Sequence, residues 1–289
     1  MTKIVNDDYP KGSALTDEEI KAKFLAENST PTQTTSTPSI VPTEVIALPS
    51  KGWFYPEDHI LSQGQIEMKY MTAKEEDILS SQNLIKQGVV IDKLLQALIV
   101  TKVNYNDLLT IDKNAIFIAA RILAYGKDYE VEIGCPNCGE KSTHAIDLGE
   151  FDEKNINWDN YEKGQTTHTF VLPIAKNKLT LKFLNHGDEK KIEEAIKGYK
   201  KISKMSGVDP DLTTRLKHII IAVDGNEDKG LINKFVDGML SRDSLALRTY
   251  LKETTPDIDT TFGYVCPHCS YEQEKMALPI GVGFFWPGV

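Results

Sequence analysis

The sequence predicts an α+β protein in which a helical N-terminal body and a β-hairpin-plus-helix insert are tied together by a four-cysteine zinc ribbon. Three observations predict this class. All four cysteines lie in two matched Cys-Pro-x-Cys pairs, and each pair follows a run that resembles a β-strand. Apolar residues at three- and four-residue spacing, the pattern of amphipathic helices, precede the first pair. Two alternating runs and further helical patterns separate the pairs.

The cysteine pairs are the strongest functional signal in the chain. Apolar and polar residues alternate before each pair and polar residues follow it, so each pair is predicted to occupy the tip of a hairpin. Two thiolates on one tip fill half of a tetrahedral zinc site, and a second such tip completes it. We therefore predict one zinc ion with four ligands, Cys135, Cys138, Cys266 and Cys269.

The predicted zinc is structural, because four thiolates leave no open coordination position for a water molecule or a substrate. Cys-Pro-His-Cys is also the active-site pattern of strongly oxidising thiol oxidoreductases. In those enzymes the pair begins a helix, whose N-terminus lowers the pKa of the first thiol. Neither pair here is followed by an amphipathic pattern. The zinc ribbon is therefore the preferred prediction, and a thiol-disulfide oxidoreductase is the alternative.

The composition narrows the class of partner. The chain has 289 residues, of which 40% are hydrophobic, and a net charge of −9. Phosphate binding needs clustered lysine and arginine, so nucleic acid is not expected as a partner. No apolar run is long enough to span a bilayer, and the first residues do not resemble a signal peptide, so no membrane association is expected. Four cysteines in metal-like spacing indicate a reducing compartment.

The sequence divides into four predicted parts. They are a disordered or extended tail (1–43), a mainly helical body with the first zinc knuckle (44–149), an inserted β-hairpin and helical domain (150–260), and the second knuckle with a C-terminal aromatic segment (261–289). The tail is rich in Ser, Thr and Pro, which cannot bury enough apolar surface to offset the entropy of ordering. Within it, a capping-box pattern at Thr16–Glu19 predicts a short helix.

The body is predicted to contain three helices behind an aromatic turn. The turn, Trp53–Tyr55, is expected to be a packed corner rather than a binding site. Thr72 and Glu75 form a capping box that begins the first helix, and Asp92 and Asp112 are predicted to cap the next two. Leucine and isoleucine at helical spacing in these segments indicate core packing rather than a cofactor site.

The insert is predicted to contain a hairpin followed by helices. Residues 150–165 are acidic and polar and are interpreted as a linker. Residues 167–174 and 178–184 alternate and are predicted to pair as a hairpin. An amphipathic helix is expected to start near Asp188, and Asp211–Val223 is predicted to form another.

The end of the chain closes the ribbon and carries an aromatic segment. Ser241 is predicted to cap a helix before the chain returns to the second cysteine pair. The aromatic run Phe284–Trp286 either packs on its own domain or forms an interface. The sequence contains no Gly-rich phosphate loop after a strand, no nucleophile elbow and no His-Glu-x-x-His pattern, so we expect no enzymatic activity.

Several stretches together form a recognisable joint motif. They are Leu48–Gly52 with Tyr55 and Pro56, Lys69–Leu79, Val90–Leu95, Ile118–Gly126, the two cysteine pairs and the closing Phe284–Pro287. This joint motif resembles the baseplate proteins of T-even-like contractile-tailed bacteriophages, and the resemblance covers the chain from Val45 to Pro287. The low-complexity residues before Val45 are additional to the family pattern.

The resemblance implies a baseplate hub subunit or a hub assembly protein with no enzymatic activity. Its implied partners are other phage baseplate or tail hub proteins, and its implied location is the host cytoplasm during assembly or the tail baseplate of the virion. The open alternative is an assembly chaperone for the hub that is absent from the mature virion. The resemblance provides no catalytic residue, and the sequence does not specify an oligomeric state.

Overall fold

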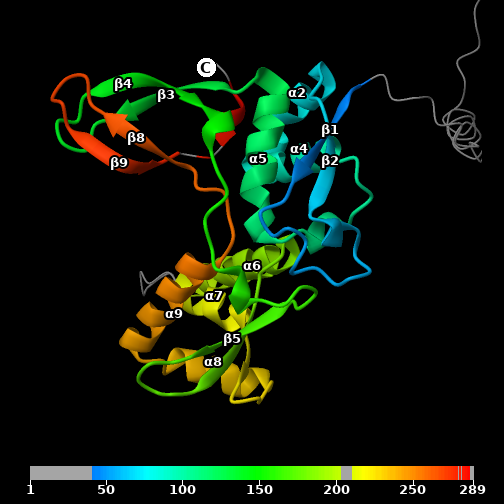
Figure 1. Ribbon diagram of the computed structural model, residues 1–289, viewed down its shortest axis with the longest axis vertical. Helices are drawn as coiled ribbons and strands as arrows, with labels where there is room; N and C mark the ends of the chain where they lie inside the picture. Colours follow the sequence, from blue (N-terminus) through cyan, green and yellow to red (C-terminus); the bar gives the residue numbers. More distant parts are fainter. Residues whose placement is uncertain (1–40, 203–209, 279, 281, 287–289) are drawn as a thin grey trace, which may run out of the picture. The chain divides into compact units, whose positions relative to one another are not determined.

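Helices and short antiparallel strands alternate along the chain, which confirms the predicted α+β class (Figure 1). The structure is a computed structural model that describes residues 41–202, 210–278, 280 and 282–286. The predicted tail before Val41 and the helix predicted at Thr16–Glu19 lie outside these residues. No helix in the described part of the chain combines the length and the apolar character needed to cross a membrane.

The N-terminal body consists of a strand pair and a group of helices. Its elements are β1 (Thr43–Ala47), β2 (Gln65–Lys69), α2 (Ala73–Ser80), α3 (Gln82–Gln87), α4 (Val90–Leu98) and α5 (Thr110–Tyr125). The capping box predicted at the start of α2 is present: the N–H and Oγ1 of Thr72 donate to Glu75 Oε2 at 3.0 and 2.6 Å. The buried faces of α4 and α5 form the centre of the largest hydrophobic cluster.

The predictions that Asp92 and Asp112 cap helices are wrong. Both residues lie inside the first turn of their helices, whose N-caps are Val89 and Leu109. Each carboxylate instead accepts hydrogen bonds from a distant part of the chain, and Asp92 accepts one from the hydroxyl of Tyr105 at 3.1 Å. A local capping pattern does not report such long-range donors.

Asp112 is fully buried and holds the aromatic turn against α5. Its carboxylate accepts from the N–H of Ser50 (2.9 Å), the hydroxyl of Ser50 (2.9 Å) and the hydroxyl of Tyr55 (2.8 Å). Burial raises the pKa of Asp112 to about 6, although these three donors act in the opposite direction. The turn itself needs Gly52, which has φ +75° and whose added Cβ would lie 2.3 Å from the carbonyl oxygen of Ser62.

The aromatic turn packs as a corner, as the sequence predicts. Phe54 is 2% exposed, and its ring lies 4.2 Å from the ring of Phe183 and 5.0 Å from that of Tyr161. Tyr161 and the buried Ile156 belong to the segment 150–165. The interpretation of that segment as a simple linker is therefore wrong, because two of its few apolar side chains enter the main core.

The described residues of the insert form a three-stranded antiparallel sheet and four helices. They are β5 (Thr167–Val171), β6 (Lys178–Lys182), β7 (Ile220–Val223), α6 (His186–Ile202), α7 (Asp211–Ile219), α8 (Lys229–Asp237) and α9 (Ser241–Thr254), with strand order β5-β6-β7. The predicted β5–β6 hairpin is present. These elements enclose a second hydrophobic cluster centred on Leu179, Leu181 and Leu247.

Three boundaries in the insert differ from the predictions. The helix predicted over Asp211–Val223 ends at Ile219, and the next four residues form β7, which pairs with β6. A short, continuously apolar run has no periodicity that separates a buried strand from a helix. The helix expected near Asp188 begins two residues earlier, and Ser241 is the first residue of α9 rather than its cap.

The C-terminal aromatic segment packs on its own chain. Phe284 and Phe285 are 1% and 0% exposed and belong to the main cluster. The Arg121 guanidinium donates through Nε to the carbonyl oxygen of Phe284 at 3.1 Å, and the Tyr129 ring lies 5.0 Å from that of Phe284. The segment therefore closes the core of the body near the first cysteine hairpin.

Candidate metal centre

Two hairpins carry the four cysteines. The first consists of β3 (Asp128–Gly134) and β4 (Lys141–Asp147), and the second of β8 (Thr261–Val265) and β9 (Glu272–Ala277). Figure 1 shows them beside each other, and the thiols at their tips are in contact. The strand runs that the sequence predicts on either side of each cysteine pair are thus present.

The two cysteine tips have the same backbone hydrogen bonds. In the first tip the N–H of Cys135 donates to Glu140 O (2.8 Å), and the N–H of Gly139 donates to Cys135 O (2.9 Å). In the second, the N–H of Cys266 donates to Tyr271 O (2.9 Å), and the N–H of Ser270 donates to Cys266 O (3.0 Å). Each tip therefore turns its two thiols to the same side of its hairpin.

A left-handed residue follows the second cysteine of each pair. Gly139 has φ +77° in the first tip, and Ser270 has φ +57° at the matching position of the second. This conformation costs a side-chain-bearing residue about 1–2 kcal/mol, whereas glycine adopts it freely. The second tip therefore retains a strained backbone where the first does not.

The four sulfur atoms have the spacing of a tetrahedral thiolate site. Cys135 Sγ lies 3.7 Å from Cys269 Sγ, Cys138 Sγ lies 3.8 Å from Cys266 Sγ, and all four sulfurs lie within 4.8 Å of one another. A tetrahedron with Zn–S bonds of about 2.3 Å has edges of roughly 3.8 Å. The donor set and its spacing therefore fit a metal ion bound by four thiolates, with each hairpin supplying two.

Hydrogen bonds to sulfur favour the thiolate form. Cys135 and Cys266 are buried, whereas Cys138 is exposed. Burial opposes ionisation of Cys135, but the N–H groups of Cys138 and Asn137 outweigh it and lower the pKa of Cys135 to about 6. The side-chain amide of Asn137 also donates to Cys269 Sγ, across the two hairpins, at 3.6 Å. These donors favour the thiolate, the form that binds metal, at Cys135. At Cys138 a backbone hydrogen bond lowers the pKa, but desolvation and the neighbouring thiols outweigh it and raise the pKa to about 12.

Only a small apolar cluster supports the cysteines. Its buried members are Ile133, Tyr264, Cys135 and Cys266, so half of them are cysteines. The hydroxyl of Tyr264 is buried with no partner in good hydrogen-bond geometry among the described residues, and burial, followed by the nearby Cys266 sulfur, raises its pKa to about 12. Our sequence reasoning missed both Tyr264 and Asn137. The only available signal was their position, two residues before a cysteine for Tyr264 and between two cysteines for Asn137.

The hairpin context differs from that of thiol oxidoreductases. Cys138 and Cys269 are each followed by a turn and a strand, so neither pair begins a helix. The helix N-terminus that lowers a catalytic thiol pKa in those enzymes is therefore missing from both tips. All four cysteines are free thiols.

A second polar cluster joins the insert to the body. His186, at the start of α6, has Nδ1 3.2 Å from Lys113 Nζ and Nε2 3.4 Å from Asp92 Oδ2. Burial, assisted by Lys113, lowers the pKa of His186 to about 4. A neutral ring can accept from Lys113 through Nδ1, whereas the buried Nε2 has no hydrogen-bond partner among the described residues. The cluster is therefore a polar contact between α4, α5 and α6. Among the described residues, only the four cysteines form a group of three or more side chains placed to hold a metal.

Comparison with known proteins places this architecture in a family. Residues 55–286, which include both cysteine hairpins and the whole insert, match the family model described as T4 bacteriophage base plate protein. The search of curated proteins found no match. The search of solved structures also found none.

Proposed function

The chain belongs to the T4 bacteriophage base plate protein family, and from that premise we propose that it is a non-enzymatic component of the central baseplate hub, with one structural zinc ion. The observation that carries the structural role is the group of four thiols within 4.8 Å of one another. Four thiolate ligands complete a tetrahedron and leave no position for substrate, which supports a structural rather than a catalytic metal.

The position of the cysteines in the chain indicates what the metal would stabilise. A zinc ion bound by the four thiolates would cross-link the hairpin that precedes the insert to the hairpin that follows it. Residues 139–265 would then form a closed loop. Asn137 would orient the Cys269 thiolate, and the N–H donors at Cys135 would hold that sulfur deprotonated. The site would thereby keep the entry to the insert and the exit from it together.

Contacts outside the metal site also bring these two connections together. Asn114 Nδ2 donates to both carboxylate oxygens of Asp257 at 3.0 and 3.1 Å, joining α5 to the chain between α9 and β8. The hydroxyl of Tyr161 donates to the carbonyl oxygen of Thr254 at 2.8 Å. We propose that baseplate partners bind a surface composed of both body and insert, whose relative placement these contacts and the metal maintain.

Affinity capture during infection tests this proposal. The tagged full-length chain is captured from infected cells, and the recovered proteins are compared with the protein content of purified mature particles. We expect recovery of central baseplate proteins and detection of the chain in the particle. Capture of hub proteins together with absence from the particle would instead favour the assembly chaperone. Capture of no baseplate protein would overturn the proposal.

A further inference from the structure

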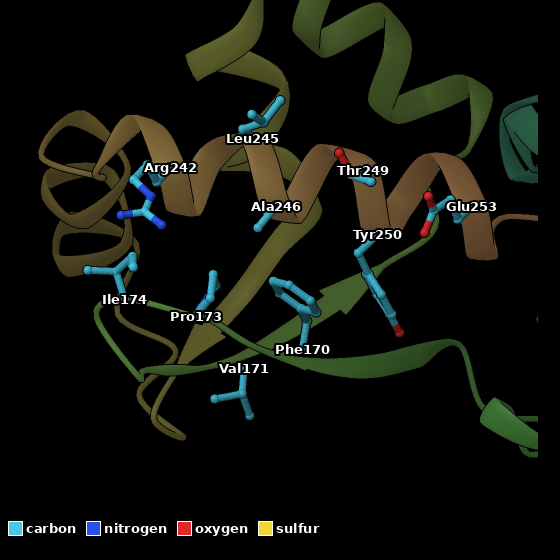
Figure 2. A pocket seen from close by; sticks show the side chains of 10 residues that line it. All are labelled: Phe170, Val171, Pro173, Ile174, Arg242, Leu245, Ala246, Thr249, Tyr250 and Glu253. Carbon is cyan, nitrogen blue, oxygen red and sulfur yellow. The ribbon is translucent and has the colours of Figure 1, made fainter.

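A groove of about 640 Å³ lies between α9 and strand β5 with the loop that follows it (Figure 2). Phe170 of β5 and Tyr250 of α9 both line it, and their rings stack on each other with centroids 4.6 Å apart. The fully buried Asp243 fixes the loop to the start of α9, because its carboxylate accepts from the N–H groups of Ile174 (2.8 Å) and Ala175 (3.0 Å). These contacts hold both walls, so the groove is preformed.

Large apolar side chains border the groove and are exposed. Val171, Ile174 and Leu245 are 54%, 43% and 56% exposed. Figure 2 shows Leu245 on the helix side and Val171 on the strand side, with Phe170 and Pro173 between them. Single exposed apolar residues are common on proteins, but several around one cavity mark a surface that another molecule covers.

Two opposite charges lie at the two ends of this groove. Figure 2 shows Arg242 at one end of α9 and Glu253 at the other. Glu253 lies eleven positions after Arg242, so the two lie on the same helix face, about 16 Å apart along the axis. Neither forms an ion pair with another residue in the described part of the chain. Ala246 and Thr249, both small, lie between them on that face, spaced four, three and four residues apart.

This charge arrangement is complementary to itself under a two-fold rotation. A second copy of α9 lying antiparallel on the first brings Arg242 of each copy to Glu253 of the other. The small side chains in the middle allow the two helices to approach closely, and Leu245 of each copy reaches the groove of the other. A partner with a different sequence would need both charges in the reverse order by coincidence.

We infer that the chain forms a two-fold symmetric dimer in which α9 pairs antiparallel with α9 of a second copy, across the groove. The pairing buries the three exposed apolar side chains and forms two equivalent Arg242–Glu253 ion pairs. This interface lies on the insert and does not involve the cysteine hairpins. It goes beyond the proposed hub function and does not depend on it.

Sedimentation of the full-length chain over a range of concentrations tests the inference. We expect a reversible dimer that Leu245→Lys abolishes. Arg242→Glu alone, or Glu253→Arg alone, replaces two attractions by two repulsions and should weaken dimerisation about tenfold. Leu212→Lys is the matched control, because Leu212 is 40% exposed on α7 and does not line the groove. It should dimerise as the unmodified chain does.

Mixing the two charge variants provides the decisive measurement. A chain with Arg242→Glu and a chain with Glu253→Arg have complementary ends, so their equimolar mixture should form a heterodimer within about threefold of the unmodified affinity. Circular dichroism of each variant verifies that it is folded. A folded pair that does not recover affinity overturns the inference, as does a dimer that Leu245→Lys leaves intact. A chain that stays monomeric to about 100 µM also overturns it and leaves an extended segment of another protein, added to the free edge of β5, as the occupant.

Discussion

The N-terminal body and the pair of cysteine hairpins are stabilised in different ways. The body packs α4, α5, the aromatic turn and the C-terminal aromatics into one large cluster of buried side chains. The hairpins share a cluster with only two buried residues besides cysteine, Ile133 and Tyr264. A two-stranded hairpin is at best marginally stable alone in water. The comparison teaches that apolar burial suffices for the body, whereas the hairpins share too little of it to be stable alone, which supports the metal site proposed above.

Removing a cysteine is expected to have the largest effect on the stability of the hairpins. Unmodified protein should contain one zinc per chain by metal analysis, and Cys266→Ser should lose it, because three thiolates no longer complete the tetrahedron. The hairpins should then lose their protected amides in hydrogen exchange. The helices should persist in circular dichroism, since each buries its own apolar face.

Val265→Ser is the control for that experiment, because Val265 is 55% exposed and adjoins Cys266 in the same hairpin. It should retain the zinc and the hairpin protection. Less than half an equivalent of zinc in fresh, unchelated protein would contradict the shared site. Loss of helicity in Cys266→Ser would show that the body and the insert depend on the hairpins, contrary to the comparison made above.

The next largest effect should come from Asp112, at the centre of the body. Asp112→Ala leaves the donors at Ser50 and Tyr55 unpaired in a buried site, so it should lower the free energy of unfolding by about 2–4 kcal/mol. Asp112→Asn keeps the shape and an acceptor and should cost much less. Urea denaturation of both variants measures this difference, and equal losses would refute the role of the hydrogen bonds.

The same residue predicts a pH dependence. Burial raises the pKa of Asp112 from 3.8 to about 6 in the folded state, so folding favours the protonated form. The stability that the protonated Asp112 adds to the folded state is fully present below pH 3.8. It is lost as the pH rises through about 6, and the loss is on the order of 3 kcal/mol. Relative to the unmodified protein, Asp112→Asn should therefore gain stability as the pH rises from 4 to 7. A pH-independent difference between the two would contradict the raised pKa.

The smallest expected change in the free energy of unfolding comes from a pair of substitutions that compares the two cysteine tips. Ser270→Gly should raise the free energy of unfolding of the hairpins by about 0.5–1 kcal/mol, because glycine removes the strain at φ +57°. Gly139→Ala should lower it by about 1 kcal/mol at the matching position, where an added Cβ meets no atom within 4 Å and only the backbone is strained. Thermal unfolding with zinc present measures both. Changes of the same sign would show that the tips are not equivalent.

Local patterns were enough to predict much of this protein. The spacing within each cysteine pair and the alternation around it predicted the two tips, because ligand spacing and strand period are properties of a few adjacent residues. The capping box at Thr72 and Glu75 and the apolar faces of α4 and α5 were predictable for the same reason. The matched form of the two pairs also predicted that they meet, although residues 139–265 separate them.

Only the tertiary structure decided which elements the remaining residues form and which contacts they make. Ile220–Val223 forms a strand because β6 offers it an open edge, and no local period distinguishes that strand from the end of a helix. Asp112 is buried rather than capping because Ser50 and Tyr55 reach it from a distant turn. The groove exists because Asp243 binds the loop after β5 to α9. Each outcome depends on a contact between residues far apart in the chain. Such a contact stabilises the fold but produces no periodic pattern in the sequence.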